Sequence, residues 1–532
     1  MTLRDLEVLV LDAQATGASP AHGHLLELGW AWTKASRESV TVQAHLLELP
    51  EGATLPRIIT RVTGIEEDDL ENAADVDDVW TTFVGECNAR APARAVIHCA
   101  RFEHSFLQPR IEPEQTLPFA SVCTLEVARR LLPELPRRGL RALAGYFGYG
   151  VDQLRRCEDH VHATAFVWRH LVDMLAERDV HTWDDAMAFA GTAAPKRGKK
   201  RVFPIPKETR LAVPDRPGVY RMLRTNGDIL YVGKATSLKR RVNSYFQKQS
   251  GRNERMLELL SQVRDLDVTP TATPLEAALL ETDTIKMLQP PYNMALLEEA
   301  REPCFVSRDL LDAAPEASDA RPVGPLPSSW RQQRYVGLHG LLAGDRETET
   351  ITRAFGWTPE TLPDAVLEKG LMMFEARNPG ATRSRASFAT AGIRRWNSQA
   401  RKDEDFQGDE GEEHWDADRV LRRLEDTLVF FSLELRRAAW LRRLANSAVT
   451  YDDGAVRTLL LRGGRVSRRA DGDTRPSVKP LPVEFDIATY DRLRVLTTEL
   501  RRVAGKGRAV TMRLASGVEL TADALARILP WV

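Results

Sequence analysis

The chain has 532 residues, of which 43% are hydrophobic and 28% are charged. At about 150 residues per domain this length suggests three or four domains, and the composition excludes a chain that is disordered throughout. The sequence has 74 basic and 75 acidic residues, five scattered cysteines, and acids where a signal peptide would be basic and then apolar. No apolar run reaches the length that crosses a bilayer. These features favour a cytoplasmic protein with no membrane partner, no disulfide framework and no zinc knuckle.

Charge is segregated along the chain. Residues 196–248 contain 15 Lys and Arg but only three acids, a net charge of +12. Such a segment is typical of a surface that binds a polyanion, so we expect DNA as a partner. Residues 403–418 contain nine acids and are predicted to form a solvated loop.

Residues 1–180 alternate strand-like and helical patterns. The apolar runs are LEVLVLDA, HLLELGWAW, VTVQAHLLEL and AVIHCA, and a helix is expected around residues 163–176. This order predicts an α/β domain with a mixed sheet. Residues 181–206, which include TAAPKRGKKRVFPIPKE, are predicted to be a basic linker because Pro, Gly and Lys are dense there.

Residues 207–297 are predicted to form a small α+β domain. Two β-rich runs in PGVYRMLRTNGDILYVGKA flank Asn226-Gly227, a pair that favours a hairpin turn. Ser237 is a candidate N-cap for one helix. Thr273 opens a capping box with Pro274 at the first helical position, which predicts a second helix running toward Leu288.

The remainder of the chain is predicted to be mainly helical. Residues 298–350 are Pro-rich and aperiodic and read as a linker, and residues 351–532 carry no motif of known chemistry. A spacing of three and four residues predicts a long amphipathic helix with Leu421, Leu424, Leu428, Phe431, Leu435 and Ala438 on its apolar face. VTYDDGAVRTLLLRGGRVS predicts a short β-hairpin, and residues 493–503 predict one more helix.

The second domain carries an ordered set of motifs. They are Gly218-Val219-Tyr220, Tyr231-Val232-Gly233, Lys234, Arg241, Glu281 and Pro291-Tyr292-Asn293. Their order and spacing resemble the GIY-YIG nuclease family, and within it the UvrC and Cho type of endonuclease domain. The resemblance implies catalytic roles for Tyr220, Tyr231, Arg241 and Glu281, with Glu281 as the ligand of Mg²⁺ or Mn²⁺. It places Lys234, Arg240 and Asn293 among the phosphate or DNA contacts.

The residue types suit phosphodiester cleavage, which needs a deprotonated nucleophile, charge compensation at the phosphate, and a metal or acid near the leaving oxygen. Tyr220 and Tyr231 are expected on adjacent strands, where two phenols can converge on one water and one can act as general base. Because an unperturbed tyrosine has a pKa of about 10, we expect Lys234 or Arg241 to favour the phenolate. Arg241 offers a planar donor fork to phosphate. Glu281 is expected to face solvent from a helix packed through Leu275, Leu279 and Ile285.

The first domain carries another set of phrases, which are VLDAQATG, ITRVTGIEEDDL, VIHCARFEHSFL, VCTLEVARRLLPEL and HATAFVWRHL. In this order they resemble the DnaQ-like DEDDh exonucleases. The resemblance implies an RNase H-like fold. In that family two metals held by four acids, with a histidine as base, hydrolyse nucleic-acid ends.

The acids of that pattern are incomplete here. The expected metal ligands and base fall on Asp12, Gln14, Glu103, Arg155 and His160. Gln14 cannot bridge metals as an anion, and Arg155 and His160 replace the histidine base and an aspartate. A shifted register would use Asp159 or Glu158 instead. We therefore expect this domain to hold DNA or a partner without cleaving, with a rearranged metal site of Asp12, Glu103 and His160 as the alternative.

The favoured hypothesis is a metal-dependent DNA endonuclease that acts in DNA repair, with other repair proteins as further candidate partners. One alternative is a dual exonuclease and endonuclease, and another is a DNA-binding scaffold that does not cleave. No convincing motif indicates the partner-binding helical hairpin or the second nuclease site of UvrC, so a complete excinuclease subunit is not expected.

Overall fold

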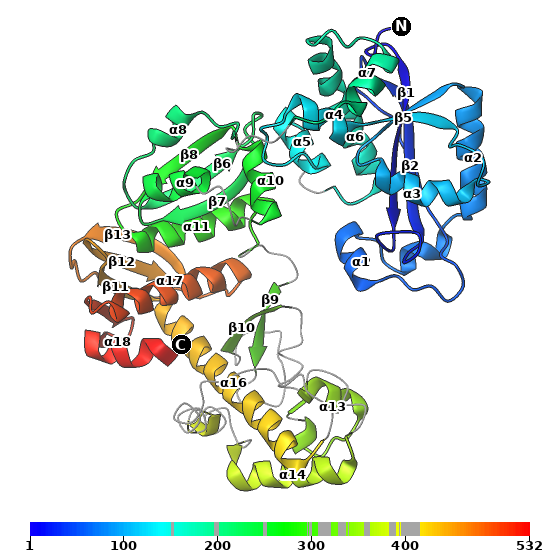
Figure 1. The fold of residues 1–532 in the computed structure, drawn as a ribbon. Coiled ribbons are helices and arrows are strands. Elements are labelled where there is room, and N and C mark those ends of the chain that lie inside the picture. The colour runs from blue at the N-terminus through cyan, green and yellow to red at the C-terminus, as the bar shows by residue number, and fades with distance from the viewer. Residues whose placement is uncertain are drawn as a thin grey trace.

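The computed structural model describes residues 1–150, 154–195, 202–247, 253–294, 296, 301–306, 321–327, 337–338, 340–355, 362–381, 390–392, 394 and 415–531. Residues 403–414 of the predicted acidic loop lie outside these ranges, as do residues 196–201 and 248 of the basic segment. Figure 1 shows the N-terminal domain at one end, a second domain beside it, and a C-terminal sheet packed against the second domain.

The first domain is built on a five-stranded sheet with the order β3-β2-β1-β4-β5. Strand β1 pairs antiparallel with β2 and parallel with β4, so the sheet is mixed, as predicted. The strands are β1 (Glu7–Ala15), β2 (Leu25–Lys34), β3 (Gln43–Leu46), β4 (Ala93–Ile97) and β5 (Phe119–Cys123).

Helices cover both faces of this sheet. Alternate residues of β1 point to opposite faces, so Val8 and Val10 join one core cluster while Leu9 and Leu11 join another. The helices are α1 (Arg57–Thr63), α2 (Val76–Ala89), α3 (Arg101–Leu107), α4 (Thr124–Leu131), α5 (Leu140–Phe147), α6 (Cys157–Ala176) and α7 (Trp183–Gly191), with short 3₁₀ turns at Asp68–Asn72 and Gln108–Arg110.

Helix α7 corrects the predicted linker of residues 181–206. Thr182 caps the helix by accepting from the backbone N–H of Asp185, and Trp183 and Ala186 are buried in the first domain's core. The segment WDDAMAFAG is short, and its two buried positions gave too little periodicity to separate it from the Pro- and Lys-rich residues that follow.

The second domain has a three-stranded antiparallel sheet with the order β7-β6-β8. Its elements are α8 (Lys207–Leu211), β6 (Gly218–Leu223), β7 (Ile229–Ala235), α9 (Leu238–Gln247), α10 (Glu254–Gln262), β8 (Asp265–Pro270) and α11 (Pro274–Leu288). The predicted hairpin is present, with Gly227 at φ +88° in its turn. Thr273 caps α11 by accepting from the N–H of Glu276, with Pro274 at the start of the helix as predicted.

The C-terminal region is a helical segment followed by a sheet. Helix α16 (Ala417–Leu444) is the long helix that the sequence predicted, and Leu421, Leu424, Leu428, Leu435 and Ala438 are buried along it. It packs with α13 (Thr348–Phe355) and α14 (Asp364–Arg377) around one core. Within the predicted linker of residues 298–350, strands β9 (Arg301–Val306) and β10 (Arg321–Pro327) form an antiparallel pair.

The predicted C-terminal hairpin is part of a larger antiparallel sheet with the order β13-β12-β11-β14-β15. Its elements are β11 (Ser447–Asp452), β12 (Val456–Arg462), β13 (Arg465–Asp471), α17 (Ile487–Gly505), β14 (Val510–Leu514), β15 (Glu519–Leu520), α18 (Ala522–Ile528) and a 3₁₀ turn at Leu529–Trp531. We call residues 447–531 the C-terminal domain. None of the helices in the described part of the chain is long and apolar enough to cross a membrane.

Candidate functional site

Three tyrosines meet on one face of the second domain's sheet. Tyr220 on β6 pairs with Gly233 on β7, so Tyr231, two residues before that glycine, is its diagonal neighbour. The ring centroids of Tyr220 and Tyr231 lie 6.2 Å apart, which confirms that the two phenols are adjacent. Tyr245 on α9 is a third member, which the sequence did not reveal, and its hydroxyl lies 2.8 Å from that of Tyr220. We call these three side chains the phenol cluster.

Gly233 makes room for the phenol cluster. A Cβ atom at this position would lie 2.4 Å from the Tyr220 hydroxyl oxygen and 2.9 Å from a Tyr231 ring carbon. Contacts this short are not tolerated, so a glycine between the two rings is required for the tyrosines to approach. The last residue of the Tyr231-Val232-Gly233 motif therefore has a direct geometric function.

Arg241 lies beside the phenol cluster, with its guanidinium carbon 4.9 Å from the centre of the Tyr245 ring. Burial raises the pKa of Tyr231, and the nearby Tyr245 raises it further, while the charge of Arg241 opposes the change. Burial also raises the pKa of Tyr220 well above its ordinary value. Arg241 thus acts on both phenols in the expected direction, but burial outweighs its charge and the pKa of each phenol is raised overall.

Glu281 projects from α11 toward the end of β7. Its Oε1 accepts a hydrogen bond from the backbone N–H of Lys234 at 2.9 Å. The side chain is half-buried, whereas the sequence predicted that it faces solvent. Burial raises the pKa of Glu281, and the Lys234 charge and N–H oppose that rise. Leu275, Leu279 and Ile285 are buried, as predicted for the packing face of α11.

The donor set at Glu281 fits a divalent cation that keeps most of its water. One hard oxygen of Glu281 is fixed by the Lys234 N–H, and no hydrogen bond to Oε2 is described, so one carboxylate oxygen remains for a ligand. Mg²⁺ is commonly held by one or two carboxylates together with water and substrate phosphate. Across the described residues no group of three or more His, Cys, Asp or Glu side chains is arranged to hold a metal, so Glu281 is a single-carboxylate candidate.

The predicted phosphate contacts have different surroundings. The Lys234 ammonium forms a 2.7 Å ion pair with Glu499, which lies on α17 of the C-terminal domain. Asn293 is buried and clasps the backbone of Val232, accepting from its N–H at 3.0 Å and donating to its carbonyl at 2.9 Å. Both ends of the Asn293 amide hold β7, and its contact with phosphate stays a prediction. Arg240 is exposed on α9, and its contact with DNA stays a prediction.

In the first domain, Asp12 on β1 is paired with a histidine. His160 Nδ1 lies 3.1 Å from both carboxylate oxygens of Asp12. Burial alone would lower the pKa of His160, but the hydrogen bond and charge of Asp12 raise it above the ordinary value. Asp159 instead accepts from the backbone N–H groups of Arg155 and Arg156 at 3.2 Å, and so caps α6. His160 thus faces Asp12, while Asp159 is used to begin the helix.

Two other predicted ligands in this domain, Gln14 and Glu103, are buried. Gln14 donates its amide N–H to the carbonyl of Arg155, and its Oε1 is buried with no hydrogen-bond partner. Glu103 is 3% exposed, and its Oε2 is also buried without a partner. Burial and the nearby charge of Asp12 raise the pKa of Glu103 to about 9. Glu103 is therefore protonated at neutral pH, and the Asp12 carboxylate is bonded to His160.

Family models match both nuclease-type regions. Residues 9–161 match the model described as Exonuclease, and residues 216–294 match the model described as UvrC-like GIY-YIG domain. A protein of Mycobacterium tuberculosis (strain CDC 1551 / Oshkosh) described as a bifunctional exonuclease/endonuclease is 31% identical over 377 residues, which are 66% of this chain and 55% of that protein. The chain thus spans about half the length of this relative.

Matches to UvrC proteins are shorter. The UvrABC system protein C of Nitrosomonas europaea is 46% identical over 93 residues, which are 18% of this chain and 15% of that protein. The solved GIY-YIG endonuclease domain of UvrC from Thermotoga maritima, bound to magnesium as its catalytic divalent cation, is 31% identical with a TM-score of 0.15, and the match covers 16% of this chain and 94% of that domain. A full-length 3'-exonuclease structure is 12% identical with a TM-score of 0.27, and the match covers 32% of this chain and 82% of that one.

Proposed function

Because the chain joins an exonuclease domain to a UvrC-like GIY-YIG endonuclease domain, we propose that it nicks DNA with the second domain and binds DNA without cutting it with the first. The observation that carries the endonuclease proposal is that the phenol cluster, Arg241 and Glu281 lie close together around the edge strand β7. Phosphodiester hydrolysis needs these three kinds of group together.

Each group has a distinct task in this proposal. Arg241 neutralises charge on the scissile phosphate through its planar donor fork. Glu281 would hold Mg²⁺ or Mn²⁺ through its remaining oxygen, and the cation would supply a lower pKa for water and charge compensation at the leaving oxygen. Tyr231, half-exposed at the edge of the phenol cluster, orients the attacking water, while the buried Tyr220 and Tyr245 fix its ring and offer a hydrogen-bonded path for a proton.

The exonuclease domain is proposed to be inactive because its residual acids cannot hold two metals. Asp12 is tied to His160, Glu103 is neutral at physiological pH, and an amide stands at Gln14. Two divalent ions and a phosphate need more negative charge than one paired carboxylate supplies. The second candidate is a dual nuclease, which the description of the Mycobacterium tuberculosis relative favours.

The direct test is nicking of supercoiled plasmid by the full chain. We expect open circles with Mg²⁺ or Mn²⁺ and none with EDTA, an unchanged rate for Asp12→Asn, and a loss of nicking for Glu281→Gln. Nicking that survives Glu281→Gln but is lost in Asp12→Asn would move the activity to the first domain. Absence of nicking by the unmodified chain with either metal, on intact and on ultraviolet-irradiated plasmid, would refute the endonuclease proposal.

A second test concerns DNA binding. The net charge of +12 over residues 196–248 supports a nucleic-acid partner. If six phosphates are contacted, the log–log slope of affinity against salt is near −5, at about −0.9 per contact. A flat salt response would count against DNA as the substrate.

We propose damaged DNA as the substrate class and other repair proteins as partners. Faster nicking of the irradiated plasmid than of the intact plasmid would support damaged DNA as the substrate.

A further inference from the structure

The helix that carries Glu281 shares its core with the C-terminal domain. Leu275 and Leu279 of α11 belong to one buried cluster with Leu493 and Leu496 of α17 and with Val449 of β11. Leu275 and Leu279 are therefore covered by a separate part of the chain, while Ile285 packs on Val219 and Val232 of the second domain's own sheet. Figure 1 shows α11 and α17 side by side.

The C-terminal domain also fixes the N-terminal end of α11. Asp453 is 3% exposed, and its Oδ2 accepts a hydrogen bond from the backbone N–H of Leu275 at 3.1 Å. The hydroxyls of Tyr451 and Thr273 lie 3.0 Å apart at the same end. A carboxylate at a helix N-terminus satisfies free N–H groups and complements the helix dipole. Asp453 thus acts as a cap supplied from outside the second domain.

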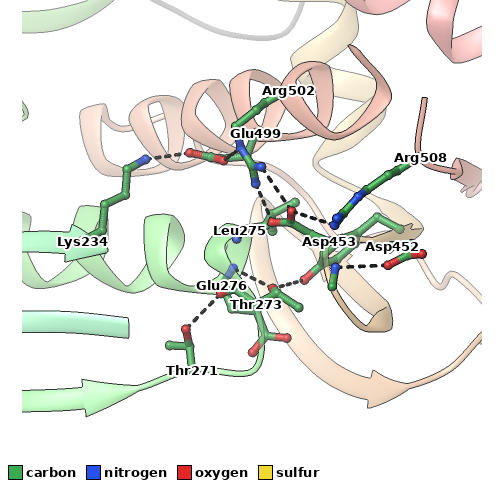
Figure 2. Close-up of polar contacts among 12 residues, drawn as sticks. Lys234, Thr271, Thr273, Leu275, Glu276, Asp452, Asp453, Glu499, Arg502 and Arg508 are labelled. Atoms are coloured by element: carbon green, nitrogen blue, oxygen red, sulfur yellow. Dashed lines mark hydrogen bonds and ion pairs between the residues drawn. The ribbon is translucent and has the colours of Figure 1, made fainter. Parts of the chain in front are cut away.

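A row of alternating charges connects this cap to Lys234, as Figure 2 shows. Arg502 donates to Asp453 at 3.1 Å and to Glu499 at 2.6 Å, and Glu499 receives the Lys234 ammonium at 2.7 Å. Arg508 adds a further ion pair to Asp453 at 3.6 Å. Both oxygens of Glu499 are therefore engaged, one by each cation, and the side chain is only 10% exposed. An immobile carboxylate of this kind can fix a flexible lysine.

Lys234 is the residue whose backbone N–H is bonded to Glu281. Its side chain remains 40% exposed, and an ammonium has three N–H donors, of which Glu499 takes one. The other donors remain available to a phosphate. A lysine side chain loses rotamer entropy when it is fixed, so holding it in place before substrate binds reduces the cost of placing its charge. The exposure of Lys234 and its remaining N–H donors indicate that Glu499 holds the ammonium in place and does not remove it from the site.

We propose that Glu499, braced by Arg502, is a positioning residue that holds the Lys234 ammonium at the phosphate-facing edge of the endonuclease site. The C-terminal domain then completes a site whose other groups all come from the second domain. This inference rests on the proposed nicking function, because it assigns Lys234 a substrate phosphate.

The test is a double-mutant cycle in the full chain. We expect Glu499→Gln to lower kcat for plasmid nicking by about tenfold while KM rises less than about threefold, since a pre-placed charge acts mainly on the transition state. In a Lys234→Met background the same change should have no further effect. The matched control is Arg492→Gln, which breaks a 2.7 Å ion pair between α17 and Asp283 of α11 without touching Lys234. Its kcat should stay within about twofold of the unmodified chain.

Equal losses in Glu499→Gln and Arg492→Gln, or an undiminished effect of Glu499→Gln in the Lys234→Met background, would show that Glu499 only stabilises the interface. A faster Glu499→Gln enzyme would show that Glu499 restrains Lys234, and would also overturn the proposal. If Glu499→Gln does not fold, Glu499→Asp replaces it, with a smaller loss in kcat expected and the same cycle applied.

A readout without cleavage separates this inference from the proposed function. Affinity for a fluorescein-labelled duplex oligonucleotide in EDTA should weaken about threefold in Glu499→Gln and not at all when Lys234→Met is already present. Coupling in this assay with no nicking by the unmodified chain would retain the positioning role and refute the nuclease. Additive effects in the binding assay would refute the positioning role even if nicking is robust.

Discussion

The two nuclease-type sites of this chain differ in how far their polar side chains are bonded to other groups of the protein. In the second domain, Arg241 and the Glu281 Oε2 border the phenol cluster without being consumed by a side-chain ion pair there. In the first domain, Asp12 is bonded to His160 and Gln14 to a backbone carbonyl. Side chains that bond to other parts of the protein stabilise the fold, whereas side chains left open toward a substrate are what a catalytic site needs.

Burial acts on both sites with different consequences. It raises the pKa of Tyr231 and of Glu281 in the second domain, yet Lys234 and Arg241 oppose the change at Glu281. In the first domain, the charge of Asp12 adds to burial and raises the pKa of Glu103 to about 9. Nearby cations thus limit the rise in the pKa of Glu281, whereas the carboxylate of Asp12 adds to the rise at Glu103. Four measurements test this difference between the two domains.

The largest effect is expected at Glu281. Glu281→Gln should lower metal-dependent nicking by at least about 10³-fold, because the single candidate ligand loses its charge. The matched control is Glu276→Gln on the same helix. The Glu276 carboxylate forms a 2.7 Å ion pair with Arg457 of the C-terminal domain. That variant should keep most of its activity. Equal rates for the two variants would remove Glu281 from the site and erase the contrast between the domains.

A smaller loss is expected from the groups that contact water or phosphate. Tyr231→Phe and Arg241→Ala should each lower the nicking rate by about 10²-fold, the size associated with proton transfer or charge stabilisation. Tyr149→Phe in the first domain serves as the control and should leave the rate unchanged. Rates equal to the unmodified chain in both test variants would contradict the assignment of the second domain as the endonuclease.

The local features of these sites could be predicted from the sequence, and the distant ones could not. The hairpin follows from Asn226-Gly227, and the start of α11 from Thr273 and Pro274, because turn and cap chemistry is local. Tyr245 lies on the helix after the hairpin, and only the packing of α9 brings its hydroxyl to Tyr220.

Long-range contacts explain the errors in the predicted site. Glu499 contacts Lys234 across 265 residues of sequence, which no local pattern indicates. The burial of Glu281 was mispredicted because α11 packs against a C-terminal domain that the sequence showed only as a hairpin and helices. Strand β14 joins that hairpin by pairing with the distant β11, which periodicity does not reveal, and the two-residue β15 is too short to show a pattern.

Restoring acids to the first domain gives the third measurement. In a full chain that carries Glu281→Gln, the unmodified exonuclease domain should release no nucleotides from end-labelled DNA with Mn²⁺. Adding Gln14→Glu, Arg155→His and His160→Asp should raise release at least about tenfold above that background, because charge and a general base return together. Robust release before these changes, abolished by Asp12→Asn, would show instead that the domain is an active exonuclease.

The smallest effect concerns the protonation of Glu103 in the folded chain. Its pKa is about 9 when folded, against an ordinary value of 4.5. Between these values the folded state keeps a proton that the unfolded state loses, so this residue makes stability fall as pH rises through that window.

Glu103→Gln cannot ionise, so it should flatten the pH dependence and raise the unfolding temperature of the first domain by about 3 °C at pH 8. Tryptophan fluorescence in EDTA from pH 5 to 9 reports on this domain through the buried Trp30, Trp168 and Trp183. Trp415 and Trp440 are buried elsewhere in the chain, so the transition assigned to the first domain is the one that moves between Glu103→Gln and the unmodified chain. The exposed Glu114, changed to Gln, provides the control. An unchanged pH slope in Glu103→Gln would mean that Glu103 is already ionised at neutral pH, and a second carboxylate would then be available beside Asp12, as an active exonuclease requires.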